Sequence, residues 1–188
     1  KQLFQLNADI LIRSLVLNGA FAIMTRIGSG FGAVPLAANA VLMNVFMLSA
    51  FFLDGLAGAA EQLSGRAVGA RFKPSFERAL KLTAGWSFAM AGVVALFFFS
   101  FGLPIIQLLT TSEDVRQTAL TYLPFAAITG LTGALAFQMD GVFIGATWSR
   151  EMRNMMLLSF AGYCAALALL VPTFGNHGLW LALNLFLL

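Results

Sequence analysis

The segment PLAANAVLMNVFMLSAFFLDGLAGAAEQL, residues 35–63, is apolar over most of its length. It is longer than the ~20 residues with which an α-helix crosses the hydrocarbon core of a bilayer. It nevertheless carries two acids, Asp54 and Glu61. Ionisable residues are rare in membrane-spanning helices, where they usually pair with one another or line a pathway. The segment therefore predicts a transmembrane helix with a polar site inside it.

The rest of the chain has the same character. Its 188 residues are 60% hydrophobic and 10% charged, whereas soluble domains are roughly 45–50% apolar and about 25% charged. Apolar runs predict spans at approximately 10–27, 35–63, 82–109, 119–146, 155–171 and 178–188. We therefore expect residues 1–188 to form one all-α, polytopic transmembrane bundle in a lipid bilayer. The chain begins with Lys1 and its sixth span is incomplete, so we expect a piece of a longer protein.

The basic residues predict the orientation of this bundle. Most of them fall in the loop at 64–81 and in the short loop after the fourth span, namely Arg66, Arg71, Lys73, Arg78, Lys81, Arg150 and Arg153. The positive-inside rule places both loops, and with them the N-terminus, in the cytoplasm. The pI of 9.5 does not predict a nucleic-acid partner, because these residues are spread between spans and form no single basic face.

The two aspartates within the spans are expected at similar depths. Asp54 lies twelve residues before Arg66, and Asp140 lies ten before Arg150. At ~1.5 Å per residue each is roughly 15–18 Å from a cytoplasmic base. Arg13 is expected at a comparable depth, so it can neutralise either acid. A pathway for substrate or ions and a purely structural ion pair that fixes helix register both remain open.

Other polar residues are further candidates for the pathway. Glu61 lies two helical turns after Asp54, although pairing with Arg66 at the interface is an alternative. Asn18, Asn44 and Gln138 are expected to form hydrogen bonds in a cavity or between helices. Gly141 and Gly145 predict a close helix contact beside Asp140.

Several other chemistries are not indicated. The one cysteine, Cys164, excludes a disulfide framework and is expected to be an inert packing residue. His177 has no metal-ligating neighbour in sequence, and no serine shows a nucleophile elbow. We therefore expect no enzyme, no metal and no cofactor. The three tryptophans are expected at the membrane interfaces; they are Trp86, Trp148 and Trp180.

The polar positions also carry a family resemblance. The segments are NADILIRS at 7–14, LAANAVLMN at 36–44, FLDGLAGAAEQLSGRAVGAR at 52–71, DGVFIGAT at 140–147, EMRN at 151–154 and NHGLWLAL at 176–183. Together they resemble the C-terminal half of the multidrug and toxic compound extrusion (MATE) family, in its DinF-like branch.

This resemblance implies a twelve-helix antiporter in the bacterial inner (plasma) membrane. It would export organic cations and amphipathic compounds in exchange for protons or sodium ions, with protons favoured. The chain would be the second six-helix lobe, with its last helix incomplete, and the N-terminal six-helix lobe would be its partner. Two alternatives are a flippase for lipid-linked saccharides, whose cavity would be lined by basic residues, and a non-transporting membrane assembly domain.

Overall fold

The fold is entirely helical in the computed structural model, which describes residues 2–188 and the side chains from residue 7 onward. The helices are α1 (Gln2–Ser29), α2 (Ala33–Gly69), α3 (Lys73–Leu109), α4 (Glu113–Gly145), α5 (Ser149–Phe174) and α6 (Asn176–Leu187). Five of them, α1 to α5, are long and apolar enough to cross a membrane. The prediction of an all-α transmembrane bundle is therefore confirmed.

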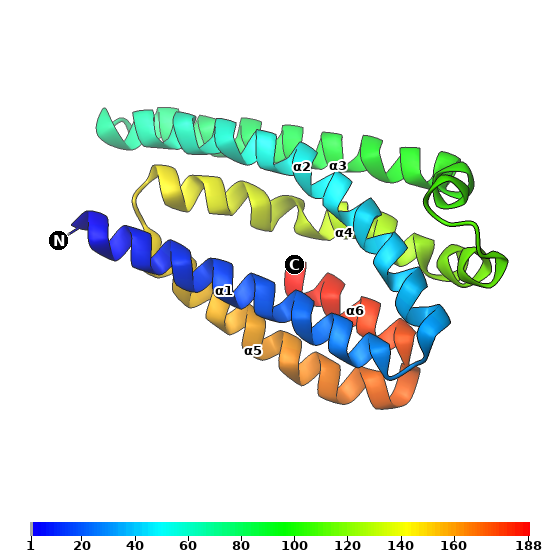
Figure 1. Ribbon diagram of the computed structural model, residues 1–188. Coiled ribbons are helices and arrows are strands. Elements are labelled where there is room, and N and C mark those ends of the chain that lie inside the picture. The colour runs from blue at the N-terminus through cyan, green and yellow to red at the C-terminus, as the bar shows by residue number, and fades with distance from the viewer. Residues whose placement is uncertain (1) are drawn as a thin grey trace.

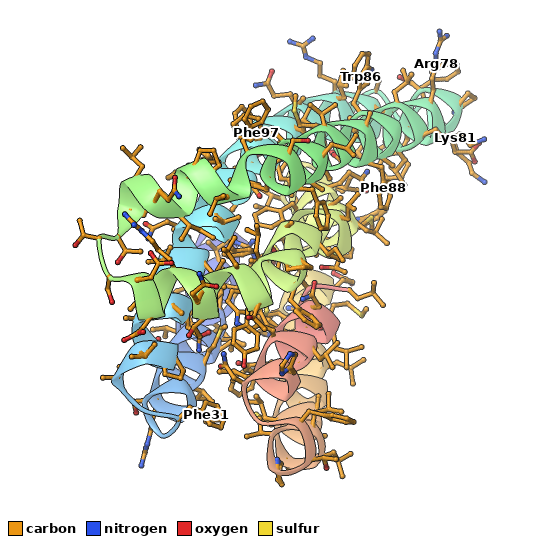
Figure 2. All side chains as sticks on the ribbon, turned by 90° about the vertical axis from the view of Figure 1, so that its right-hand side faces the viewer. Phe31, Arg78, Lys81, Trp86, Phe88 and Phe97 are labelled. Carbon is orange, nitrogen blue, oxygen red and sulfur yellow. The ribbon has the colours of Figure 1, made fainter. Side chains whose placement is uncertain are left out.

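The connections alternate between the two ends of the bundle. The start of α1, the α2–α3 turn and the α4–α5 turn lie at one end, and the other three connections lie at the opposite end (Figure 1). Arg78 and Lys81 mark the first end and Phe31 marks the second (Figure 2). The loops rich in lysine and arginine thus share one end, which the charge pattern predicts to be cytoplasmic.

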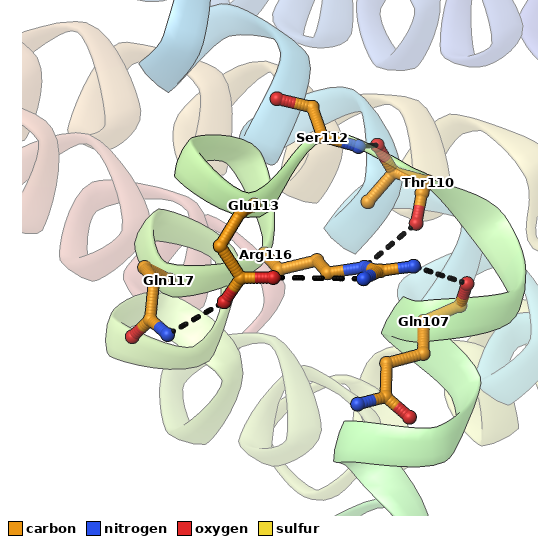
Figure 3. A network of polar contacts seen from close by, with 6 residues as sticks. All are labelled: Gln107, Thr110, Ser112, Glu113, Arg116 and Gln117. Carbon is orange, nitrogen blue, oxygen red and sulfur yellow. Dashed lines mark hydrogen bonds and ion pairs between the residues drawn. The ribbon is translucent and has the colours of Figure 1, made fainter.

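Arg26, in the last turn of α1, and Arg116 depart from this pattern, and the contacts of Arg116 explain its position in the α3–α4 connection. Its guanidinium donates to the carbonyl oxygens of Thr110 at 2.9 Å and Gln107 at 3.2 Å, and lies 3.5 Å from Glu113 (Figure 3). These carbonyls belong to the C-terminal end of α3, where a cation is favourable to the helix dipole. Arg116 therefore caps a helix.

The helices pack in two groups, with α2, α3 and α4 on one side and α1, α5 and α6 on the other (Figure 1). The contact between α2 and α4 is the tightest. A Cβ atom at Gly141 would overlap the carbonyl oxygen of Ala57, and one at Gly145 would overlap that of Glu61. The close approach predicted from the two glycines is thus confirmed, because only glycine lets the two backbones meet there.

Two residues lie elsewhere than the sequence predicts. Trp180 is fully buried, and its indole donates to Asn39 Oδ1 at 2.9 Å. It is therefore a core residue and not an interfacial anchor. Asn39 and Asn176 exchange two further hydrogen bonds beside it, at 2.7 and 3.0 Å. Cys164 is exposed on α5, so it does not fill a packing position. Trp86 and Trp148 are exposed, as interfacial residues are.

Candidate functional site

Three helices position the candidate site. Helices α1 and α2 share the turn at 30–32 and diverge from it, and α4 lies between them toward the end that carries the α2–α3 and α4–α5 turns (Figure 1). Arg13 belongs to α1, Asp54 to α2 and Asp140 to α4. Residues far apart in sequence therefore lie near one another because α4 lies between the two helices that carry Arg13 and Asp54.

An ion pair between Arg13 and Asp140 joins α1 to α4. Arg13 Nη2 donates to Asp140 Oδ2, and the two side chains are 19% and 20% exposed. Arg13 Nε is buried and has no hydrogen-bond partner. A paired charge within an apolar bundle avoids most of the cost that an isolated one bears. The pairing of Arg13 with a carboxylate, which the sequence predicted, is therefore present.

Asp54 differs from Asp140 in its surroundings. Its side chain is exposed on the surface of this lobe, and it forms no ion pair within 4.0 Å among the described residues. It still lies within the electrostatic influence of Arg13 and of Asp140. The neighbouring Leu53 is buried, and the next residue of a helix points ~100° away from it. The predicted position in the lobe interior thus holds for Asp140 and is wrong for Asp54.

Three other candidates also face outward from this lobe. Asn18 donates to the carbonyl oxygen of Ser14 at 2.8 Å, and Asn44 to that of Ala40 at 2.9 Å, both within their own helices. Glu61 is exposed and forms no ion pair with Arg66, contrary to the interfacial pairing considered from the sequence. Neither asparagine bridges two helices, because each amide is satisfied by the preceding turn.

Gln138 is the candidate that the structure removes from any pathway. It is 1% exposed, and its amide donates to Thr83 Oγ1 at 3.1 Å. It lies between α3 and α4. Asp140, which pairs with Arg13 of α1, comes two residues later and therefore points ~200° away around α4. Its role is therefore an interhelical hydrogen bond, the alternative that the sequence left open.

Sequence reasoning missed Asp9, the most buried acid of the described residues. Its side chain is 3% exposed, accepts from Arg153 Nη1 at 2.7 Å, and accepts from Ser149 Oγ at 2.7 Å. It was missed because it precedes the apolar run at 10–27 by one residue. The available signal was its spacing of four from Arg13, which places the two side chains on the same face of α1.

With this geometry established, comparison with known proteins identifies the family. The sequence matches the MatE family over residues 10–170, which is most of the chain. The chain belongs to the MatE family. This MatE chain is 41% identical, over its whole length, to the DNA damage-inducible protein F of Escherichia coli, of which it covers 40%. It is 27% identical to the chloroplastic Protein DETOXIFICATION 44 of Arabidopsis thaliana, with 93% of this chain and 34% of that protein covered.

Solved structures show the same fold. A MATE transporter of Vibrio cholerae superposes with a TM-score of 0.92 at 21% identity, covering 100% of the MatE chain and 43% of its own. A MOP superfamily transporter of Pyrococcus furiosus superposes with a TM-score of 0.88 at 16% identity, covering 99% and 42%. The MatE chain thus spans about 40% of the length of the Escherichia coli relative and 34% of that of the Arabidopsis thaliana relative. Membership of this transporter family agrees with the prediction that the chain is not an enzyme.

Proposed function

We propose that this chain forms one lobe of a multidrug antiporter in the bacterial inner (plasma) membrane. The transporter exports organic cations and amphipathic compounds from the cytoplasm in exchange for protons, with sodium ions as the second candidate. The observation that carries this proposal is the pairing of Arg13 with Asp140 beside an Asp54 that is exposed on this lobe.

The charge of this group suits cation binding. One guanidinium faces two carboxylates, so the group carries one uncompensated negative charge when both acids are ionised. Asp54 is the acid without an ion-pair partner among the described residues, and it is the one that remains accessible. A proton or an organic cation can neutralise it, and the two then compete for one charge. Competition of this kind is what exchange of a cation for a proton requires.

The surface beside Asp54 suits an amphipathic substrate. Met47 and Phe51 are 46% and 69% exposed on α2. Phe51 lies about one helical turn before Asp54, and Met47 lies about two turns before it. Methionine is flexible and polarisable, and aromatic rings attract cations. A second lobe that covers this face completes a cavity with one acid and adaptable apolar walls. Alternating access by rocking the two lobes then exposes that cavity to each side of the membrane in turn.

Two alternatives receive less support. A saccharide flippase predicts unpaired bases on this face, but Arg13 is neutralised by Asp140. An assembly domain predicts that every intramembrane charge is paired, but Asp54 has no ion-pair partner among the described side chains. A cation exporter accounts for both the paired and the unpaired acid.

The experiment is transport by the full-length protein in inverted membrane vesicles. A pH gradient should drive uptake of a fluorescent organic cation, and addition of that cation should dissipate the gradient. Replacement of the pH gradient by a sodium gradient tests the second coupling ion. Transport of a lipid-linked saccharide without any ion gradient would refute the proposal in favour of the flippase.

A further inference from the structure

The turns that follow α2 and α4, at the predicted cytoplasmic end, have the same backbone conformation. In each, the helix ends in a Schellman motif. The amides of Arg71 and Phe72 donate to the carbonyls of Val68 and Ala67, and those of Thr147 and Trp148 donate to the carbonyls of Ile144 and Phe143. The sequences match as well, with GARF at 69–72 and GATW at 145–148. Each turn therefore presents an aromatic residue directly after its left-handed residue.

The left-handed position of both turns is occupied by a residue other than glycine. Arg71 has φ 51° and Thr147 has φ 62°. Glycine is the usual residue there, because the Cβ atom of any other residue disfavours this backbone conformation. A backbone outlier of this kind is a reason to look for a use of the side chain that it carries. For Arg71 the candidate use is its guanidinium.

Arg71 lies on a cavity between the two turns. The cavity has a volume of about 230 Å³ and is lined by Ala67, Val68, Arg71, Phe72, Lys73, Phe76 and Trp148. The rings of Phe76 and Trp148 meet edge to face at 5.8 Å and form its wall. Pockets for drug-sized ligands are roughly 300–1,000 Å³, so this cavity suits a smaller group. The surface of the cavity is almost entirely apolar, and the side chains of Arg71 and Lys73 are exposed at its rim, so the cavity suits an apolar group that is attached to an anion.

The surrounding charge is strongly positive. Between residues 64 and 81 there are five bases and one acid, Glu77. Lys73 Nζ lies 3.7 Å from Glu77 Oε1, but both side chains are well exposed, so this pair is weak. Arg71 forms no ion pair with any described residue. Arg78 and Lys81 project from the same end of α3 (Figure 2).

The depth of the cavity matches the headgroup layer of the cytoplasmic leaflet. Helices α2 and α3 continue beyond their apolar runs, which end at 63 and begin at 82, by roughly 10 Å at ~1.5 Å per residue. The headgroup region extends ~5–8 Å beyond the hydrocarbon core on each side, so these helix ends lie at its outer edge. Phe72 and Trp148 are 57% and 43% exposed there, as residues at a membrane interface are.

We propose that this cavity binds the phosphodiester headgroup of an anionic phospholipid from the cytoplasmic leaflet. Arg71 and Lys73 contact the phosphate. The rings of Phe72, Phe76 and Trp148 cover the glycerol and the first methylenes of the lipid. The bound lipid joins the α2–α3 turn to the α4–α5 turn. This site does not depend on the direction or coupling of transport, so its failure is distinguishable from failure of the antiporter proposal.

The test compares retention of two lipids by the full-length protein. The protein is equilibrated in mixed micelles with equal amounts of phosphatidylglycerol and phosphatidylcholine of the same acyl chains, and the bound lipids are counted by native mass spectrometry. Arg71→Gly removes the guanidinium and relieves the left-handed backbone, so it is expected to fold. It should lower the preference for phosphatidylglycerol about fivefold, which corresponds to the ~1 kcal/mol of one base near an anionic surface.

Two controls isolate the cavity. Thr147→Gly makes the same backbone change in the matching turn without removing a charge, and Arg78→Gln removes a charge from α3 outside the cavity lining. Both should keep the preference. Lys73→Gln is the second test variant and should lower it in the same direction as Arg71→Gly.

Three results would overturn the site. An unchanged preference in both Arg71→Gly and Lys73→Gln would show that the cavity binds no headgroup. An equal loss in Arg78→Gln would show diffuse attraction. Displacement of the lipid by inorganic phosphate at an equal concentration would show a free-anion site and not a lipid site.

Discussion

Asp9 and Arg13 lie one turn apart on α1 and do not pair with each other. Asp9 binds Arg153 and Ser149 of α5, whereas Arg13 binds Asp140 of α4. Helix α1 is thus held by two ion pairs of opposite polarity that point to different helices. Because α1 also borders the face that carries Asp54, these pairs fix one wall of the candidate site.

Removal of the charge at Asp9 should destabilise the protein. Asp9→Asn leaves Arg153 without its carboxylate partner, and breaking a buried pair costs ~3–5 kcal/mol. Arg153 is 31% exposed, so we expect about 2–3 kcal/mol, seen as a lower unfolding temperature of the full-length protein in detergent. Arg153→Gln should cost more, because it leaves the buried carboxylate of Asp9 with only the hydroxyl of Ser149 as a partner. Equal stability of Asp9→Asn and the native protein would show that the pair contributes nothing.

The sequence predicts depth along a helix better than direction around it. Apolar length predicted the helices because lipid leaves backbone groups no other partner than the helix itself. Counting from basic loops placed Arg13 and Asp140 at levels where they do meet. Asp54 was expected in the lobe interior and Trp180 at a membrane interface, and neither lies there, because almost every face of these helices is apolar and the sequence gives no direction for a single polar residue. Asp9 was missed for a different reason, namely that it adjoins the predicted span.

The α2–α4 contact gives a prediction with an internal control. Gly145→Ala places a Cβ against the carbonyl of Glu61 and the hydroxyl of Ser64, so α2 and α4 must separate. We expect a loss of ~1–3 kcal/mol, the usual cost of overpacking, or more because the contact is with backbone. Gly162→Ala on α5 meets nothing within 4 Å and should stabilise by ~0.5–1 kcal/mol. The unfolding temperatures of the two variants should therefore move in opposite directions.

The orientation of the bundle can be measured with single cysteines. Ser75 lies at the start of α3 and Ser112 lies just before α4, at opposite ends and both exposed. Cys164 must first be replaced by alanine, since it is exposed on α5. In intact cells an impermeant reagent should label Ser112→Cys and spare Ser75→Cys. The reverse pattern would invert the predicted topology and would also place the proposed lipid site in the outer leaflet.

The two aspartates should fail in different ways. Asp140→Asn leaves the guanidinium of Arg13, whose Nε already lacks a partner, without its ion pair. It should therefore reduce the amount of folded protein together with transport. Asp54→Asn loses no ion pair and should fold normally. If Asp54 exchanges a proton for substrate, the rate of pH-gradient-driven efflux by this variant should fall about tenfold, or the efflux should lose its dependence on pH between about 6 and 8.

Membrane expression and efflux are measured for each variant in the full-length protein. Asn44→Ala, at another exposed polar position of α2 without a charge, is the control and should keep its pH dependence. Efflux with unchanged pH dependence in Asp54→Asn would show that the unpaired acid is not the exchange site.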